Sequence, residues 1–225
     1  SVTIGINPPE VVKDRIPLIL EGTSVKSLKI KLGSPKGIDS DKEMFQQVVE
    51  STKKYNVKIR VDANGGWDVP QAKQMMQWLA DHKVDYIEQP LKEGEEERVK
   101  ELYKNRTLPI YVDESCRVSN SIPSYAKYVD GVNMKRSKCC GITDASRIIA
   151  SARAHGLKTM IGCMSESSIA IAAAAALTGG IDHIDLDSHY NLAPDPAIGA
   201  PMVEGVTMPT EKPGHGAELK SEFYA

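Results

Sequence analysis

Three acidic side chains, Asp62, Glu88 and Asp113, each stand at the end of a short apolar run that predicts a buried strand. The three strands follow one another along the chain, so their ends would be neighbours at one edge of a parallel sheet. Convergent carboxylates repel one another unless a cation lies between them, and hard oxygen ligands select Mg²⁺, or Mn²⁺ in its place, over zinc. Any one of the three alone suggests a surface carboxylate or half of a local ion pair. Together they predict a metal site.

Two lysines, Lys31 and Lys135, end the second and the sixth predicted strands. In an eight-stranded barrel these strands lie four apart, so the two ammonium groups would face each other across one mouth. A lysine acts as a base only when burial or nearby positive charge lowers its pKa. Lys29, on the same side of its strand as Lys31, would supply such a charge. The alternative is that these lysines only neutralise the acidic ring or extend into solvent.

A metal between two opposed lysines predicts a particular reaction. A substrate carboxylate held by the metal has its α-proton acidified. Two bases on opposite faces of the α-carbon let the proton leave from one side and return on the other, which inverts the stereocentre. The metal, acting as a Lewis acid, would stabilise the enediolate that develops. We therefore expect an isomerase that moves a proton on the α-carbon of a carboxylate.

A second acidic pair, Asp185 and Asp187, ends the eighth predicted strand, which lies across the mouth from the fourth. Residues two apart on a strand point the same way. Without an evident metal partner, the pair would suit a positive group at the far end of the substrate. An ion pair with a local lysine or arginine explains the spacing nearly as well.

These positions require a parallel barrel to hold them. Eight short apolar runs between residues 3 and 187 alternate with seven helical segments between residues 8 and 177, a pattern that indicates an α/β fold. Eight such units in 225 residues favour a closed, TIM-like barrel over an open sheet. No convincing helix follows the last strand. We therefore expect a (β/α)7β catalytic barrel over residues 1–188 and an irregular segment rich in Pro and Gly over residues 189–225.

Several helix ends carry recognisable signals. Asp68 predicts the start of one helix, and Gly156 predicts the left-handed residue just after another. Asn7, which precedes two prolines, predicts an N-cap for the first helix, and Gly22 predicts its end.

The composition excludes several classes of protein. A net charge of -2 gives no electrostatic reason to bind nucleic acid or an anionic membrane. No apolar run approaches the roughly 20 residues of a membrane span, and no signal peptide is visible. The four cysteines match no zinc or redox spacing. We expect reduced thiols and a cytoplasmic protein.

The same residues lie in motifs that resemble the muconate-lactonising subgroup of the enolase superfamily, and within it the dipeptide epimerases, which include L-Ala-D/L-Glu epimerase. The motifs, which together span nearly the whole chain, are Leu28-Lys29-Ile30-Lys31, Val61-Asp62-Ala63-Asn64, Glu88-Gln89-Pro90-Leu91, Asp113-Glu114-Ser115, Asn133-Met134-Lys135 and Asp185-Leu186-Asp187. The resemblance implies that the three carboxylates are Mg²⁺ ligands and that Lys31 and Lys135 are the acid/base pair.

The resemblance also implies roles for the residues that would touch substrate. Lys29 would contact the substrate carboxylate and tune Lys31, and Asp185 and Asp187 would hold the N-terminal ammonium of a dipeptide. Further residues implied to line the pocket, with ordinary loop packing as the alternative, are Thr3 after the first strand and Cys163 and Ser165 after the seventh.

The chain departs from the family pattern in two places. Family members often carry Gly-Gly after the sixth strand, where this chain has Cys140-Gly141, so the conformation of that loop is open. The family also has an N-terminal α+β capping domain, which we expect to lie outside this chain because the sequence begins without Met and almost at once with a strand. The segment over 189–225 is similar to the one that returns toward that cap.

The expected function is thus a Mg²⁺-dependent dipeptide epimerase that inverts the α-carbon of the C-terminal residue. Within the same subgroup the alternatives are an o-succinylbenzoate synthase, a muconate cycloisomerase or an N-acylamino acid racemase, for which the pair Asp185 and Asp187 would lack its cation. A catalytically impaired barrel that binds metal or peptide is an alternative of another class. The preferred dipeptide side chains and the oligomeric state, a homo-oligomer included, stay open.

Overall fold

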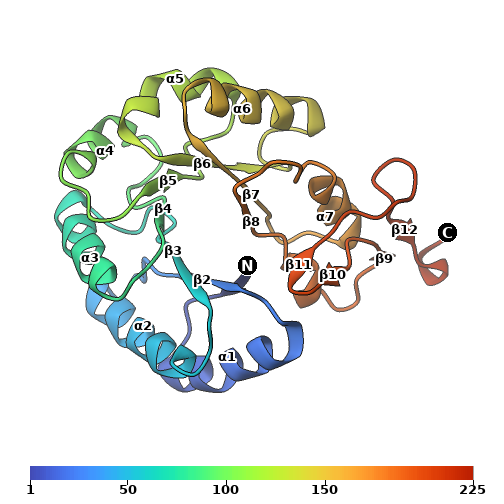
Figure 1. The fold of residues 1–225 in the computed structure, drawn as a ribbon, viewed down its shortest axis with the longest axis horizontal. Coiled ribbons are helices and arrows are strands. Elements are labelled where there is room, and N and C mark those ends of the chain that lie inside the picture. Colours follow the sequence, from blue (N-terminus) through green and yellow to red (C-terminus); the bar gives the residue numbers. More distant parts are fainter. Residues whose placement is uncertain (225) are drawn as a thin grey trace.

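The sheet of this protein is a single curled array of eight parallel strands in sequential order, from β1 to β8. The computed structural model describes residues 1–224. Viewed down its short axis, the sheet curves around a centre and the helices lie outside it (Figure 1). The strands are β1 (Val2–Ile4), β2 (Ser27–Lys31), β3 (Lys58–Asp62), β4 (Ile87–Glu88), β5 (Ile110–Val112), β6 (Gly131–Lys135), β7 (Lys158–Gly162) and β8 (His183–Ile184). The predicted (β/α)7β architecture is confirmed, but among the described residues β1 and β8 are not paired, so strand pairing curls the sheet without closing it.

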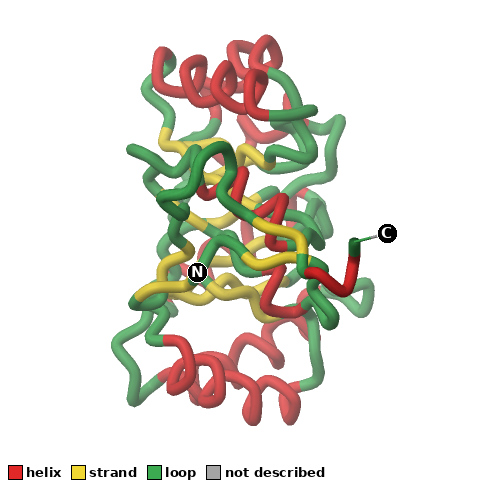
Figure 2. Tube along the Cα trace, turned by 90° about the vertical axis from the view of Figure 1, so that its right-hand side faces the viewer, coloured by secondary structure: helices red, strands yellow, loops and turns green. Residues whose placement is uncertain are grey.

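Seven helices connect these strands, and each packs an apolar face on the sheet. In α6, for example, Ala145, Ile148, Ile149 and Ala152 are buried, which is the spacing of one helix face. The helices are α1 (Pro9–Thr23), α2 (Ile38–Thr52), α3 (Val69–Asp81), α4 (Glu96–Tyr103), α5 (Ile122–Tyr125), α6 (Ile142–Ala154) and α7 (Ser168–Ala175). In a view turned by 90° the strands run through the middle between helices on either side (Figure 2). No helix in the part of the chain described has the length and apolar character to cross a bilayer.

The helix-end signals are partly confirmed. Asp68 caps α3 in a capping box with Gln71, and Gly156 follows α6 with a φ of 73°. The prediction for the first helix is wrong at both ends. Asn7 turns its side-chain amide back to the Gly5 carbonyl, so Pro8 takes the cap position. The helix runs past Gly22 because Ser24 adopts the left-handed conformation instead, with a φ of 55°.

The segment after β8 packs on the outside of the barrel between its first and last helices. Gly205 lies directly against the backbone of Ser24, which ends α1, and Gly199 lies against Ala172 of α7. Asp195 accepts a hydrogen bond from the Ser168 hydroxyl at the start of α7 (2.5 Å). The segment forms short strand pairs and turns, namely η3 (Ser188–Asn191), β9 (Ala197–Ile198), β10 (Met202–Val203), β11 (Val206–Thr207), β12 (Glu218–Leu219) and η4 (Ser221–Phe223). That it also approaches a capping domain stays a prediction.

An aromatic layer fills the barrel beneath the C-terminal ends of the strands. The rings of Tyr86 and Tyr111 stack with centroids 4.3 Å apart, and His183 packs on both. Gly131 leaves the space that the Tyr111 ring occupies, since a Cβ there would lie 2.2 Å from it. The Nε2 atom of His183 is 3.1 Å from the Tyr111 hydroxyl. Burial, helped by the nearby Arg60 guanidinium, lowers the pKa of His183 to about 4.

Burial of His183 in this layer predicts that the folded protein loses stability at acidic pH. Because the pKa of His183 is lower in the folded protein than its ordinary value of 6.5, its contribution to stability is present above about pH 6.5 and is lost as the pH falls toward 4. Urea unfolding at pH 7.5 and pH 5 should show a fall in the free energy of unfolding that is about 1 kcal/mol larger for the wild type than for His183→Gln, allowing for the partial exposure of the ring. Equal losses in the two proteins would contradict the assignment.

Candidate active site

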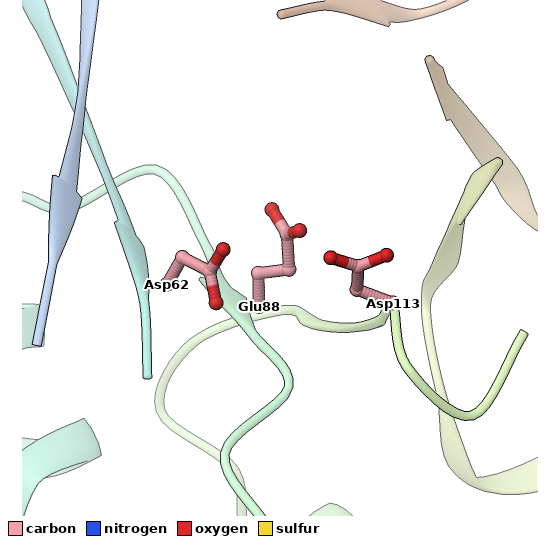
Figure 3. A group of neighbouring side chains, drawn as sticks. All are labelled: Asp62, Glu88 and Asp113. Atoms are coloured by element: carbon pink, nitrogen blue, oxygen red, sulfur yellow. The ribbon is translucent and has the colours of Figure 1, made fainter. Parts of the chain in front are cut away.

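The three carboxylates predicted to bind metal converge at the C-terminal ends of neighbouring strands. Asp62 ends β3, Glu88 ends β4 and Asp113 directly follows β5, and their side chains point into one space (Figure 3). One oxygen from each lies within 4.8 Å of those from the other two. All three side chains are almost completely buried, with 0%, 0% and 1% of their surface exposed.

The cluster fits a hard divalent cation. Glu88 Oε2 and Asp113 Oδ2 are buried and accept no hydrogen bond of ordinary geometry, although lysine ammonium nitrogens lie 3.0 and 2.5 Å from them. Burial, with the charge of Asp62 second, raises the pKa of Glu88 to about 8. Buried carboxylate oxygens that converge on one point are the hard ligands that Mg²⁺ prefers.

Lys31 and Lys135 lie at the two ends of this carboxylate row. Lys31 Nζ is 2.6 Å from Asp62 Oδ2, and Lys135 Nζ is 2.5 Å from Asp113 Oδ2. Burial lowers the pKa of Lys135, but the charge of Asp113 outweighs it and raises the pKa above its ordinary value. This direction is opposite to the one expected from the sequence for a lysine base, because the adjacent carboxylate stabilises the ammonium form. The two lysines therefore approach the cavity from opposite sides of Glu88, as the strand order predicts.

Lys29 lies deeper than Lys31, with 2% of its surface exposed. Its ammonium is shared among three carboxylates, at 3.2 Å from Asp62, 3.0 Å from Glu88 and 3.1 Å from Asp185. Burial opposes ionisation, but these charges raise the pKa of Lys29 well above its ordinary value. Lys29 is thus a fixed positive charge at the floor of the cavity, and its contact with a substrate carboxylate stays a prediction.

The two acidic residues after β8, Asp185 and Asp187, have different partners. Asp185 forms the ion pair with Lys29, so the local ion pair left open by the sequence exists at this residue. Burial would raise the pKa of Asp185, but the charge of Lys29 holds it below its ordinary value. Asp187 accepts a hydrogen bond from the Thr3 amide (2.7 Å) and has no lysine or arginine partner among the described residues. Burial and the charge of Asp185 raise the pKa of Asp187 to about 6.

Asp113, the three lysines and the acidic pair open on one cavity of about 640 Å³ at the mouth of the barrel, whereas Asp62 and Glu88 are fully buried and do not line it. The three residues implied to line a pocket, Thr3, Cys163 and Ser165, are in its wall. Thr3 lies within β1 rather than after it, and it meets Asp187 through its backbone amide. Burial and Asp185 raise the pKa of Cys163 to about 11, so its thiol is neutral at physiological pH. Met164, 54% exposed, adds an apolar surface.

The sequence reasoning missed three polar residues that hold the carboxylates in place. Lys138 donates to Asp113 Oδ1 (2.6 Å) and to the Asn133 carbonyl (3.1 Å). Asn133 donates to Glu88 Oε1 (2.7 Å). Gln89 accepts a hydrogen bond from the Asp113 amide (2.8 Å) and adopts a φ of 39°. A signal was available for Asn133, which faces inward two residues before Lys135. Gln89 lies in one of the motifs quoted above, although no role was predicted for it, and no signal marked Lys138.

The departure from Gly-Gly after β6 has a structural consequence. Cys140 adopts the left-handed conformation with a φ of 64°, and Gly141 follows with a φ of 125°. A side chain with a Cβ is strained at such a φ. The loop therefore keeps a glycine-like path with an exposed cysteine in it.

Cys140→Gly is expected to raise the free energy of unfolding by about 0.5–1 kcal/mol, because relief of the strained conformation outweighs the added freedom of the unfolded chain. Urea unfolding measures this difference. Cys140→Ala is the matched control, since it removes the thiol and keeps the Cβ, and it should give no gain. An equal gain in both variants would trace the effect to the thiol rather than to the backbone.

Comparison with known proteins gives a consistent picture. The family described as enolase C-terminal domain-like matches residues 17–223. A hydrophobic dipeptide epimerase from Flavobacteria bacterium (strain MS024-2A) is 79% identical over 225 residues, which is 100% of this chain and 64% of that relative. An L-Ala-D/L-Glu epimerase from Bacteroides thetaiotaomicron is 33% identical over 96% of this chain and 54% of its own length.

Among solved structures, the dipeptide epimerase from Enterococcus faecalis V583 complexed with Mg and the dipeptide L-Leu-L-Tyr matches with a TM-score of 0.86 at 32% identity. The match covers 96% of this chain and 62% of that structure. The chain therefore spans less than two thirds of the length of these relatives.

Proposed function

This chain belongs to the enolase C-terminal domain-like family, and from that membership we propose that it carries the catalytic residues of a Mg²⁺-dependent dipeptide epimerase. The observation that carries the proposal is the placement of Lys31 and Lys135 at the two ends of the carboxylate row, 2.6 and 2.5 Å from its outer members. A site that only binds metal needs the carboxylates alone. A site that inverts a carbon needs a proton-transfer group on each face.

The residues of this chain divide the reaction between them. Mg²⁺ bound to the carboxylate row would supply Lewis-acid stabilisation for the negative charge that develops on the substrate carboxylate. The Nζ atom of one lysine removes the α-proton, and the Nζ atom of the other delivers a proton to the opposite face. The lysine that acted as base ends protonated and its partner ends neutral, so both exchange protons with solvent before the next cycle. Lys29 keeps a compensating positive charge beneath the row.

The acidic pair supports a dipeptide as the substrate. Asp187 is 4% exposed and, within residues 1–224, forms no ion pair with a lysine or arginine, while its neighbour Asp185 is already paired. A substrate ammonium would supply the missing positive charge, because a buried carboxylate without a partner is costly. The names of relatives such as the hydrophobic dipeptide epimerase from Roseobacter litoralis, together with exposed Met164, favour apolar side chains. Cytoplasmic location and any homo-oligomer stay predictions.

The decisive experiment follows the α-proton by NMR in D₂O with the full gene product and Mg²⁺. We expect exchange at the C-terminal residue of apolar dipeptides, and a loss of about tenfold or more when the substrate ammonium is acetylated. Asp187→Asn should reduce that discrimination. Exchange on N-acyl amino acids but on no dipeptide would favour the racemase and cycloisomerase alternatives. Binding of Mg²⁺ with no exchange on any substrate would favour a barrel that only binds.

A further inference from the structure

The first turn of α2 holds a carboxylate that the proposed reaction does not use. Asp41 is 1% exposed, and among the described residues no lysine or arginine pairs with it. It accepts three hydrogen bonds, from the Gly33 amide (3.0 Å), the Ser34 amide (2.9 Å) and the Trp67 indole (2.9 Å). A buried carboxylate that accepts three hydrogen bonds fixes the positions of the groups that donate them.

The three donors belong to two loops that leave the active site. Gly33 and Ser34 follow β2 directly after Lys31, and Trp67 follows β3 five residues after Asp62. The Leu32 amide donates to the Asp62 carbonyl (2.8 Å), so the two loops start in register. Asp41 therefore links the loop that follows the proposed base, Lys31, to the loop that follows the first proposed metal ligand, Asp62.

The two loops are also in backbone contact. A Cβ on Gly33 would lie 2.2 Å from the Ala63 carbonyl oxygen, and a Cβ on Gly66 would lie 2.6 Å from the Gly33 Cα. Gly33 has a φ of 81°. Because the two loops are packed backbone against backbone, we expect a displacement at Asp41 to move the strand end that carries Lys31.

From these contacts we propose that Asp41 is a positioning residue for Lys31, holding its strand end against the end of β3 so that Lys31 Nζ stays aimed at the substrate carbon. The inference rests on the proposed two-lysine function. All three partners of Asp41 are donors, and only a carboxylate accepts at both oxygens. An asparagine would place an NH₂ group against at least one N–H. Stabilisation of α2 alone would not need this, since Asp39 in the same turn also faces the helix N-terminus.

The test uses the direction of proton exchange, which a purely structural role would not change. With the full gene product at saturating Mg²⁺, α-proton exchange in D₂O is measured separately from each epimer of one dipeptide. Lys31→Ala defines which epimer depends on Lys31. Asp41→Asn should slow exchange from that epimer about tenfold or more and exchange from the other less than about threefold. Asp39→Asn, an exposed neighbour in the same helical turn, is the matched control and should change neither.

If Asp41→Asn does not fold, Trp67→Phe removes one of the three donors and keeps a smaller aromatic ring in the same place, and it should show the same asymmetry to a smaller extent. Equal slowing from both epimers, or no slowing in a variant whose melting temperature is unchanged, would overturn the inference. A wild type that exchanges neither epimer would instead refute the proposed function, so the two failures are distinct.

Discussion

Replacing Lys135 with alanine should lower the rate of epimerisation by about a thousandfold, because one face of the α-carbon then has no proton donor or acceptor. Lys135 Nζ lies against Asp113 Oδ2, and Asp113 keeps its second lysine partner, Lys138, in the variant. Metal binding should therefore persist. Exchange in D₂O should survive from the epimer whose proton faces Lys31 and be lost from the other. Stopped assays of stereochemistry and NMR of the α-proton measure the two quantities.

The controls for this prediction are built into the chain. Lys31→Ala should give the opposite asymmetry, with exchange surviving from the epimer that faces Lys135. Lys127→Ala changes an exposed lysine far from the row and should leave both rates unchanged. If Lys135→Ala exchanges both epimers at the wild-type rate, the two-base mechanism is wrong at this residue.

Glu88→Gln should have opposite effects on metal affinity and on the stability of the metal-free protein. The variant loses a charged ligand from the centre of the row, so the Kd for Mg²⁺ should rise by about a hundredfold or more. In the metal-free protein, burial and the charge of Asp62 raise the pKa of Glu88 to about 8, which means that its ionised form opposes folding. Glutamine keeps an acceptor for Asn133 and removes the repulsion. The free energy of unfolding should therefore rise by about 1–3 kcal/mol.

Calorimetric titration with Mg²⁺ and urea unfolding in EDTA test the two halves of this prediction. Glu114→Gln, which neutralises a carboxylate at the cavity rim outside the row, should change neither quantity. Destabilisation of the metal-free protein by Glu88→Gln would show that the pairing of Glu88 with Lys29 outweighs the repulsion within the row.

Much of the site could be predicted because, in a parallel barrel, the order of the strands along the chain fixes which strand ends are neighbours and which lie opposite. The polar residues that end strands 3, 4 and 5 had to be neighbours, and Lys31 and Lys135 had to be opposed, once the strands were sequential. The alternation of side chains along β2 also placed Lys29 beneath Lys31. These are geometric consequences of the repeat, and they do not depend on packing detail.

The remaining features depend on contacts between distant residues, which no local pattern contains. The ion pair of Lys29 with Asp185 joins β2 to the segment after β8. It neutralises Asp185 and leaves Asp187 without a lysine or arginine partner among the described residues. The hydrogen bonds of Asp41 and Gln89 run from side chains to loop amides. The predicted end of α1 at Gly22 was wrong because Ser24 took the left-handed conformation, a choice that the packing of Gly205 against Ser24 accompanies.

The close contact of Gly33 with Ala63 and Gly66 has a consequence for how such a protein can diversify. A single added methyl group at Gly33 or at Gly66 would collide with backbone, so these two positions beside the strand ends that carry Lys31 and Asp62 should tolerate almost no side chain. The loop after β7 is different, because Met164 and Ser165 border the same cavity and Met164 is largely exposed. Libraries that randomise residues 164 and 165 should yield many folded variants with new substrate ranges, whereas libraries at residues 33 and 66 should yield mostly unfolded chains. If so, the substrate range of such a protein could change through the loop after β7 while the residues that move the proton stay the same.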